Sequence, residues 1–151
     1  MSDGLLIHSP ANVLSQLLMD KGAGTDPIDE DAWPIYSNGE PSSPDNVITI
    51  TDTSGEIQGR VMFTGQELEQ YGVQIRIRCN DPEDGFAKAN ALTVTMDQEI
   101  YRDTVTLDSD TYLVHAVNRK GGVIVLGKDA NKTDLNLYTI NVTVTLTRTT
   151  I

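Results

Sequence analysis

The first regular pattern of apolar residues predicts an amphipathic helix over residues 10–21. Val13, Leu14, Leu17 and Leu18 recur at spacings of three and four residues, which places them on one stripe of a helix. A stripe of this kind is normally buried, so we expect this helix to pack on the rest of the domain.

The residues at both ends of this segment are typical of helix boundaries. Ser9 is suited to the N-cap and Pro10 to the first helical position. Lys21 places a cation in the last turn, and Gly22 can take the left-handed conformation that ends a helix.

A second helical pattern follows the turn at residues 80–84, whose carboxylates suit a helix N-terminus. The residues predicted to lie on its buried side are Phe86, Ala89, Leu92, Met96 and Ile100. The small residues Ala87, Ala89 and Ala91 would let the helix approach a sheet closely. Residues 93–95 weaken the pattern, because β-branched side chains lose rotamer freedom in a helix.

Six further segments are rich in residues that favour strands. They cover residues 47–52, 57–63, 73–79, 111–117, 123–127 and 138–149. The first two are expected to form a hairpin, and residues 65–72 are expected to be a break between strands. Residues 118–122 carry a strong turn signal.

The last of these segments has the clearest strand pattern. Ile140, Val142, Val144 and Leu146 alternate with a row of mostly threonine residues, which places the two sets on opposite faces. We expect the threonine face to point outward. An exposed edge of this length would invite pairing with another chain.

The elements therefore occur in the order α-β-β-β-α-β-β-β, which predicts an α+β fold. Two helices cannot provide a crossover for every strand, so the sheet should be mixed and mostly antiparallel, with both helices packed on one face. At 151 residues the chain is expected to form a single domain over 1–151. A long irregular loop is predicted over residues 23–46.

The charge of the chain excludes several classes of function. Lys and Arg number 11 against 22 Asp and Glu, which gives a formal net charge of −11. Such an anion is repelled by nucleic acid backbones and by anionic membranes. The single cysteine, Cys79, cannot form an intramolecular disulfide, and no segment is typical of a signal peptide or a membrane span. We expect folding in the cytosol.

The motifs that could carry chemistry are weak. Residues 122–128 match the letters of a phosphate-binding loop, but their centre is a strand pattern and Asp129 stands where a magnesium-binding hydroxyl is needed. The acidic residues of 26–31 and 108–110 lack the spacing of a calcium loop, although a divalent ion at 26–31 stays open. His8 and His115 do not form a metal-binding helix. We therefore expect no cofactor and no enzymatic activity.

Four residues are candidates for a subunit interface: Trp33, Gln74, Arg76 and Arg78. Gln74 and the two arginines share one face of a predicted strand, and arginine pairs with carboxylates at interfaces through two parallel hydrogen bonds. The alternative is a solvated face with local ion pairs. Trp33 either fills a gap in the core or contacts a neighbouring subunit.

Several short motifs occur together in an order that resembles a known family. They are Lys21-Gly22-Ala23-Gly24, Trp33-Pro34, Asp52-Thr53-Ser54-Gly55, the strand 72–78, Phe86-Ala87-Lys88-Ala89, and Asn141-Val142. This organisation resembles the tail-terminator and minor-capsid family of long-tailed siphophages, over nearly the whole chain.

The resemblance implies a structural role in the virion. Such proteins form a ring, usually a homohexamer, that caps the head-proximal end of the tail tube and stops its polymerisation. The implied partners are further copies of the chain, the tail tube protein and a head connector or completion protein. The protein would be made in the host cytoplasm and reside at the head–tail interface. DNA would pass through the lumen without specific binding.

The charge of such a ring has a consequence for its assembly. Six copies would carry 6 × −11 = −66 formal charges. Their repulsion predicts monomers at low salt and rings at high salt, where charges are screened.

Three other structural roles stay open: another head–tail connector or completion protein, a tail tube subunit, and a capsid decoration or adhesion module.

Overall fold

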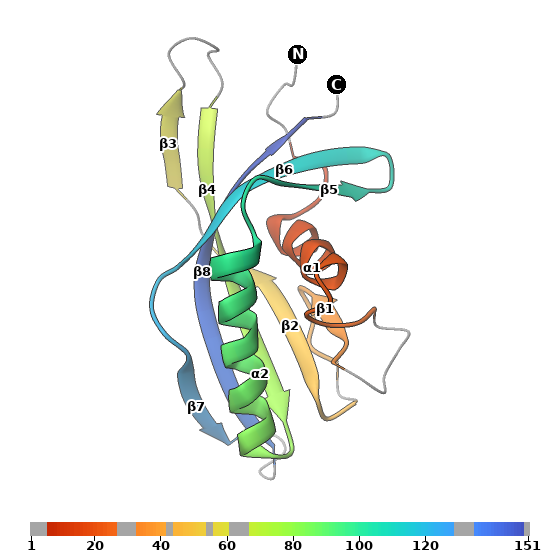
Figure 1. Cartoon of the computed structure of the whole chain (residues 1–151), viewed down its shortest axis with the longest axis vertical. Helices are drawn as coiled ribbons and strands as arrows, with labels where there is room; N and C mark the ends of the chain where they lie inside the picture. The colour runs from red at the N-terminus through yellow and green to blue at the C-terminus, as the bar shows by residue number, and fades with distance from the viewer. Residues whose placement is uncertain are drawn as a thin grey trace.

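The computed structural model describes residues 6–26, 33–41, 44–53, 56–60, 67–128 and 135–149 (Figure 1). The elements, in chain order, are α1 (Pro10–Asp20), β1 (Ile35–Ser37), β2 (Val47–Asp52), β3 (Glu56–Arg60), β4 (Glu67–Cys79), α2 (Pro82–Val94), the π-helical segment η1 (Thr95–Glu99), β5 (Asp103–Leu107), β6 (Asp110–Arg119), β7 (Ile124–Lys128) and β8 (Asn136–Arg148).

Two long strands, β4 and β8, form the centre of the sheet and pair antiparallel with each other. The other edge of β4 pairs with β2 at residues 73–78 and with β3 at residues 67–70. The other edge of β8 pairs with β6 at residues 142–148 and with β7 at residues 136–139. Strand β1 runs parallel to β2, and β5 forms an antiparallel hairpin with β6. The fold is α+β with a mixed, mostly antiparallel sheet, as predicted.

The structure differs from the prediction in two additional strands, one strand boundary and one strand pairing. Strand β1 lies inside the segment expected to be an irregular loop, and β5 was not predicted. Strand β4 begins at Glu67, so residues 67–72 are part of a strand rather than a break; residues 61–66 lie outside the described residues. Strands β2 and β3 both pair with β4 and do not form a hairpin with each other.

The last strand does not form an exposed edge that would invite pairing with another chain. Its length and alternation are confirmed, because β8 spans Asn136–Arg148 with Ile140, Val142, Val144 and Leu146 buried. However, β8 has paired strands on both of its edges. Alternation reveals which face of a strand is buried, but it does not reveal whether the strand has one neighbour or two.

Helix α1 begins at Pro10 as predicted and ends at Asp20, so Lys21 is its C-cap rather than a residue of its last turn. The Ser9 side chain accepts a hydrogen bond from the backbone N–H of Asn12, and Gly22 has a φ of +76°, which favours glycine. The Asp52 carboxylate accepts a further bond from the Ala11 N–H at 2.8 Å. This bond fixes the first turn of α1 to the end of β2, and the helix contacts β1, β2 and β5.

Helix α2 contacts β8 and β4, and Gly85 allows the close approach. A side chain at Gly85 would collide with Cys79 and lie 2.8 Å from the ring of Tyr138. The prediction for Phe86 is wrong, since 48% of it is exposed, and Ala87 and Ala91 are exposed as well. The other four residues of the predicted stripe, Ala89, Leu92, Met96 and Ile100, are buried as expected, and Gly85 and Thr93 are buried with them.

Both helices contribute to one hydrophobic core on the sheet. From β4 it includes Val73, Ile75 and Ile77, whose register partners on β8 are the equally buried Val142, Ile140 and Tyr138. None of the described helices is long and apolar enough to cross a membrane.

Candidate assembly interface

The strand face opposite the core carries the three polar residues predicted for an interface. Gln74, Arg76 and Arg78 alternate along β4 with the buried residues of the core, so they share the other face. Their surroundings differ, because Pro41, Pro44 and Asp45 bind Arg78 through their carbonyl oxygens.

Arg78 is buried and forms hydrogen bonds within its own chain. It is only 3% exposed, and its guanidinium donates to the carbonyl oxygens of Pro41 and Pro44 at 2.7 Å and of Asp45 at 3.2 Å. Glu40 lies 3.8 Å away and balances part of its charge. These bonds hold Pro41, Pro44 and Asp45 on the sheet, and they engage Arg78 within its own chain.

Arg76 remains accessible. About a third of its side chain is exposed, and its Nε lies 3.3 Å from a Glu40 oxygen. The direction of that contact does not suit a hydrogen bond, so the pair is held by charge alone. Gln74 lies beside it, with its amide nitrogen 3.5 Å from the Asn141 oxygen. The interface role predicted for Arg76 and Gln74 stays a prediction that this geometry permits.

Trp33 lies apart from the arginines. It is partly buried against the hydrophobic core, and its carbonyl accepts a bond from the Thr25 N–H at 2.8 Å. The structure therefore does not bring the four predicted interface residues together. The core contact matches the first of the two interpretations of Trp33, while a subunit contact stays a prediction.

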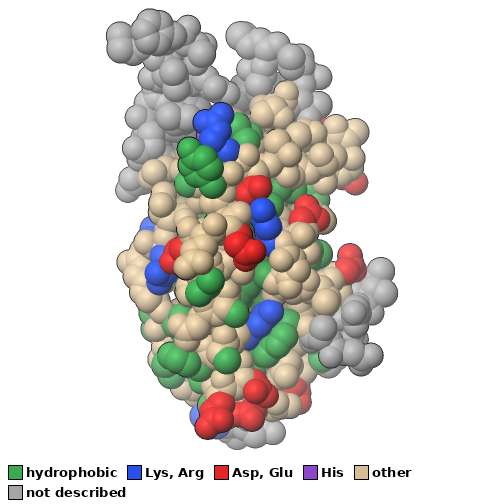
Figure 2. Space-filling model, viewed as in Figure 1, with side chains coloured by type: hydrophobic (Ala, Val, Ile, Leu, Met, Phe, Trp, Pro, Cys, Tyr) green, Lys and Arg blue, Asp and Glu red, His purple; other side chains and the backbone are tan. Residues whose placement is uncertain are grey.

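The largest unexpected surface feature is strand β7. Its residues Ile124, Val125 and Leu126 are 46%, 63% and 49% exposed, and all five of its residues are exposed. Among the described residues β7 pairs only with β8, which leaves its other edge open. Figure 2 shows hydrophobic side chains gathered over this strand, at the lower left.

Phe86 extends this apolar surface toward α2. Its ring contacts the ring of Tyr138 with centroids 6.2 Å apart, and Tyr138 is the register partner of Val125. Val125 therefore points to the same side of the sheet as Phe86. We call Ile124, Val125, Leu126 and Phe86 together the β7 edge.

On the other side of the sheet the β7 edge lies near Arg76. Ile124 pairs in register with Thr139, and Thr139 pairs with Arg76 on β4. Two strand spacings, about 10 Å, separate their backbones. The sequence signal for β7 was its apolar run, which also describes a buried strand, so exposure could not be predicted from it.

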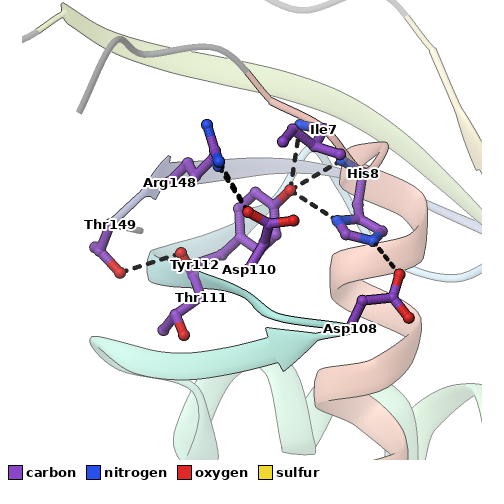
Figure 3. Close-up of polar contacts among 8 residues, drawn as sticks. All are labelled: Ile7, His8, Asp108, Asp110, Thr111, Tyr112, Arg148 and Thr149. Atoms are coloured by element: carbon purple, nitrogen blue, oxygen red, sulfur yellow. Dashed lines mark hydrogen bonds and ion pairs between the residues drawn. The ribbon is translucent and has the colours of Figure 1, made fainter. Parts of the chain in front are cut away.

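A line of polar groups fastens the N-terminal segment to the hairpin of β5 and β6 (Figure 3). The buried Tyr112 hydroxyl oxygen accepts bonds from the backbone N–H of Ile7 at 3.2 Å and of His8 at 2.9 Å. Nδ1 of His8 lies 2.9 Å from the same hydroxyl, and its Nε2 lies 3.0 Å from Asp108. A neutral His8 protonated on Nε2 satisfies all of these groups.

This arrangement is structural rather than catalytic. A carboxylate, an imidazole and a hydroxyl stand in line, but the hydroxyl of Tyr112 is fully buried and no substrate could reach it. Asp110 is equally engaged, in a 2.8 Å ion pair with Arg148 that joins β6 to β8. The two carboxylates of 108–110 thus have partners within the protein.

The other motifs weighed in the sequence carry no site in the described residues. These residues contain no group of three or more side chains that could hold a metal ion. Of the acidic residues in 26–31, only Asp26 lies within the described part of the chain. The phosphate-loop letters fall on strand β7. Cys79 is a buried free thiol, and burial raises its pKa.

No model of a known protein family matches the chain, and no curated protein matches it in sequence. The resemblance to siphophage tail terminators thus depends on the order of short motifs, and the function it implies is a proposal.

Proposed function

We propose that this chain is a structural virion protein of the tail-terminator type. Its copies form a ring on the head-proximal end of the tail tube, stop tube polymerisation and meet the head connector. The observation that carries the proposal is the β7 edge, an open strand with three consecutive exposed apolar side chains. Strand edges of this kind pair with other chains, and soluble monomers normally shield them.

The surface around Arg76 supports the same role. About a third of the Arg76 side chain is exposed, on the same face as Ile124, and its guanidinium can pair with a second carboxylate from a neighbouring copy. A chain with 22 acidic residues supplies many such carboxylates. Gln74 and Trp33 are secondary candidates for contacts with a neighbour.

The charge of the chain fits a ring through which DNA passes. A wall of anionic subunits offers the phosphate backbone no release of counterions, so the genome is not retained in the lumen. The same charge opposes ring closure by free subunits.

Sedimentation velocity and negative-stain microscopy across a salt series test the proposal. We expect monomers at about 0.05 M salt and annular particles at about 1 M, where the Debye length is about 3 Å. Rings that dissolve as salt rises would contradict the repulsion argument. A protein that stays monomeric in every condition, and beside purified tail tubes, would overturn the proposed function.

The same experiment separates the terminator from a tail tube subunit. A tube subunit polymerises with itself into long filaments, whereas a terminator forms rings and caps tubes that already exist. A head completion protein forms rings but binds to heads rather than to tubes, which co-sedimentation with each partner distinguishes.

A further inference from the structure

We propose that the β7 edge of one copy binds the β1 side of the next copy, so that subunits join head to tail. The β1 side is strand β1 with the exposed acidic residues Asp26, Glu40 and Asp45 that flank it. This inference rests on the proposed ring function and names the two surfaces that meet.

The sheet places these two surfaces on opposite sides of the subunit. Successive register pairs form a row that crosses five strands, from β1 to β7: Ile35, Ile48, Ile77, Tyr138 and Val125. Four strand spacings, about 19 Å, separate its ends. Figure 1 shows β1 and β7 at opposite sides of the sheet. A contact between two different surfaces of identical subunits is the kind that generates rings.

Two lysines stand at the ends of β7, Lys120 before the strand and Lys128 as its last residue. No acidic residue occurs between Asp110 and Asp129, which is the longest such interval in the sequence. That interval holds Arg119, Lys120 and Lys128, of which Arg119 is already in a 2.8 Å ion pair with Asp97. The other basic residues number 11 − 3 = 8 against 22 acidic residues, a balance of −14. Lys120 and Lys128 are therefore the charges through which the β7 edge can attract acidic residues of another copy.

The β1 side carries the complementary charge. From residue 20 to residue 45 the described residues include four acidic ones, Asp20, Asp26, Glu40 and Asp45, and one basic one, Lys21, a balance of 1 − 4 = −3. The alternative, pairing of β7 with a second β7, would bring Lys120 and Lys128 of both copies together. It would also close a two-fold dimer rather than a ring.

Burial of apolar side chains supplies most of the binding free energy of this contact. Charge complementarity determines that β7 meets the β1 side rather than a second β7. Covering Val125 and Leu126 removes exposed hydrocarbon from water, a contribution that salt does not screen. Salt at the same time weakens the repulsion between the acidic bodies of the subunits. The contact is thus compatible with assembly at high salt.

The apolar part is tested by the double variant Val125→Asp with Leu126→Asp. We expect the concentration needed for half-assembly to rise about tenfold or more, measured by sedimentation velocity. The matched control is Tyr101→Asp, because Tyr101 is 76% exposed but lies between η1 and β5, away from both surfaces. We expect this control to assemble as the wild type does.

The direction is tested by reversing charges at about 0.15 M salt, where contacting charges still interact. Lys120→Glu with Lys128→Glu changes the net charge from −11 to −15 and should weaken assembly. Adding Asp26→Lys and Asp45→Lys returns the net charge to −11 and should restore assembly. Adding Glu99→Lys and Asp108→Lys instead gives the same net charge but should not restore it.

The outcomes separate this inference from the proposed function. A wild type that never assembles overturns both. If the wild type forms rings and the β7 variants form them equally well, the head-to-tail contact alone is overturned. The same holds if both pairs of charge substitutions restore assembly equally. Urea unfolding of each variant shows whether any loss of assembly reflects loss of the fold.

Discussion

Strands β7 and β8 are neighbours in the sheet, but they differ in how much of their side chains is buried. Both are rich in β-branched residues, and they pair with each other. The first five residues of β8 are all buried, and from Ile140 to Leu146 buried residues alternate with partly exposed ones, whereas β7 is exposed at every position. The difference lies in the neighbours: β8 has a strand on each edge, while β7 has one only, within the described part of the sheet.

The contrast teaches that an apolar strand becomes core only when something covers it. The run Ile124-Val125-Leu126 is as apolar as a central strand, yet it has neither a helix above it nor a strand beyond it in the described structure. An exposed apolar strand promotes aggregation of a monomer, whereas in a subunit of an assembly it can form the contact with a neighbouring copy. We infer that β7 receives its missing neighbour from another copy.

The largest difference expected between the two strands is in their contribution to folding. Ile140→Ala on β8 removes methylene groups from a site with 0% exposure, and it should lower the free energy of unfolding by about 2–5 kcal/mol. Ile124→Ala on β7 should change it by no more than about 0.5 kcal/mol, because the residue is half exposed. Urea unfolding of both variants under monomeric conditions measures this; equal losses would mean that β7 is buried in solution.

The elements that the sequence predicted well are those with strong local signals. The boundaries of α1 follow from Ser9, Pro10 and Gly22, and the extent of β8 follows from its alternation. Capping and alternation are local properties that do not depend on the rest of the fold. They were therefore readable without knowledge of the neighbours of either element.

The elements that were missed depend on partners distant in the sequence. Phe86 lies outside the core because Gly85 packs against Cys79 and Tyr138, which turns the ring to the edge of the helix. In the same way, Arg78 is buried because its guanidinium is bound by the backbone of Pro41, Pro44 and Asp45, which are distant in the sequence. The sequence placed the two arginines on one face but could not show that one was covered.

Arg78 and Arg76 provide the second test, because the first is buried, as most of β8 is, and the second is partly exposed, closer to the situation of β7. Arg78→Met leaves three carbonyl oxygens without their charged donor and should lower the free energy of unfolding by about 2–3 kcal/mol. Arg76→Met should stay within about 0.5 kcal/mol of the wild type, yet weaken assembly. Thermal unfolding and sedimentation measure the two effects separately. An Arg76 variant that assembles normally would remove Arg76 from the interface.

A smaller effect is expected where α2 meets β8. Gly85→Ala places a methyl group against Cys79 and the Tyr138 ring, and overpacking should outweigh the gain in helix propensity by about 1–2 kcal/mol. Gly121→Ala, before β7, meets no atom within 4 Å and should be neutral. Unfolding midpoints in urea compare the two. If Gly85→Ala were stabilising, the approach of α2 to β8 would be looser than the structure shows.

The smallest expected effect concerns His115 on β6, the other strand that covers the outer edge of β8. Burial and the nearby charge of Arg102 lower the pKa of His115, and its Nε2 lies 3.2 Å from the Thr147 hydroxyl on β8. The folded state therefore favours the neutral ring, while the unfolded chain takes up a proton near the ordinary value of about 6.5. Stability due to this group is present above that pH and is lost as the pH falls below it. His115→Gln should flatten the decline in unfolding free energy between about pH 7.5 and 5.5, as measured by urea titrations. If the slope of unfolding free energy against pH were unchanged, His115 would have the same pKa in the folded and unfolded states. Burial by β6 and β8 would then be too weak to affect this side chain.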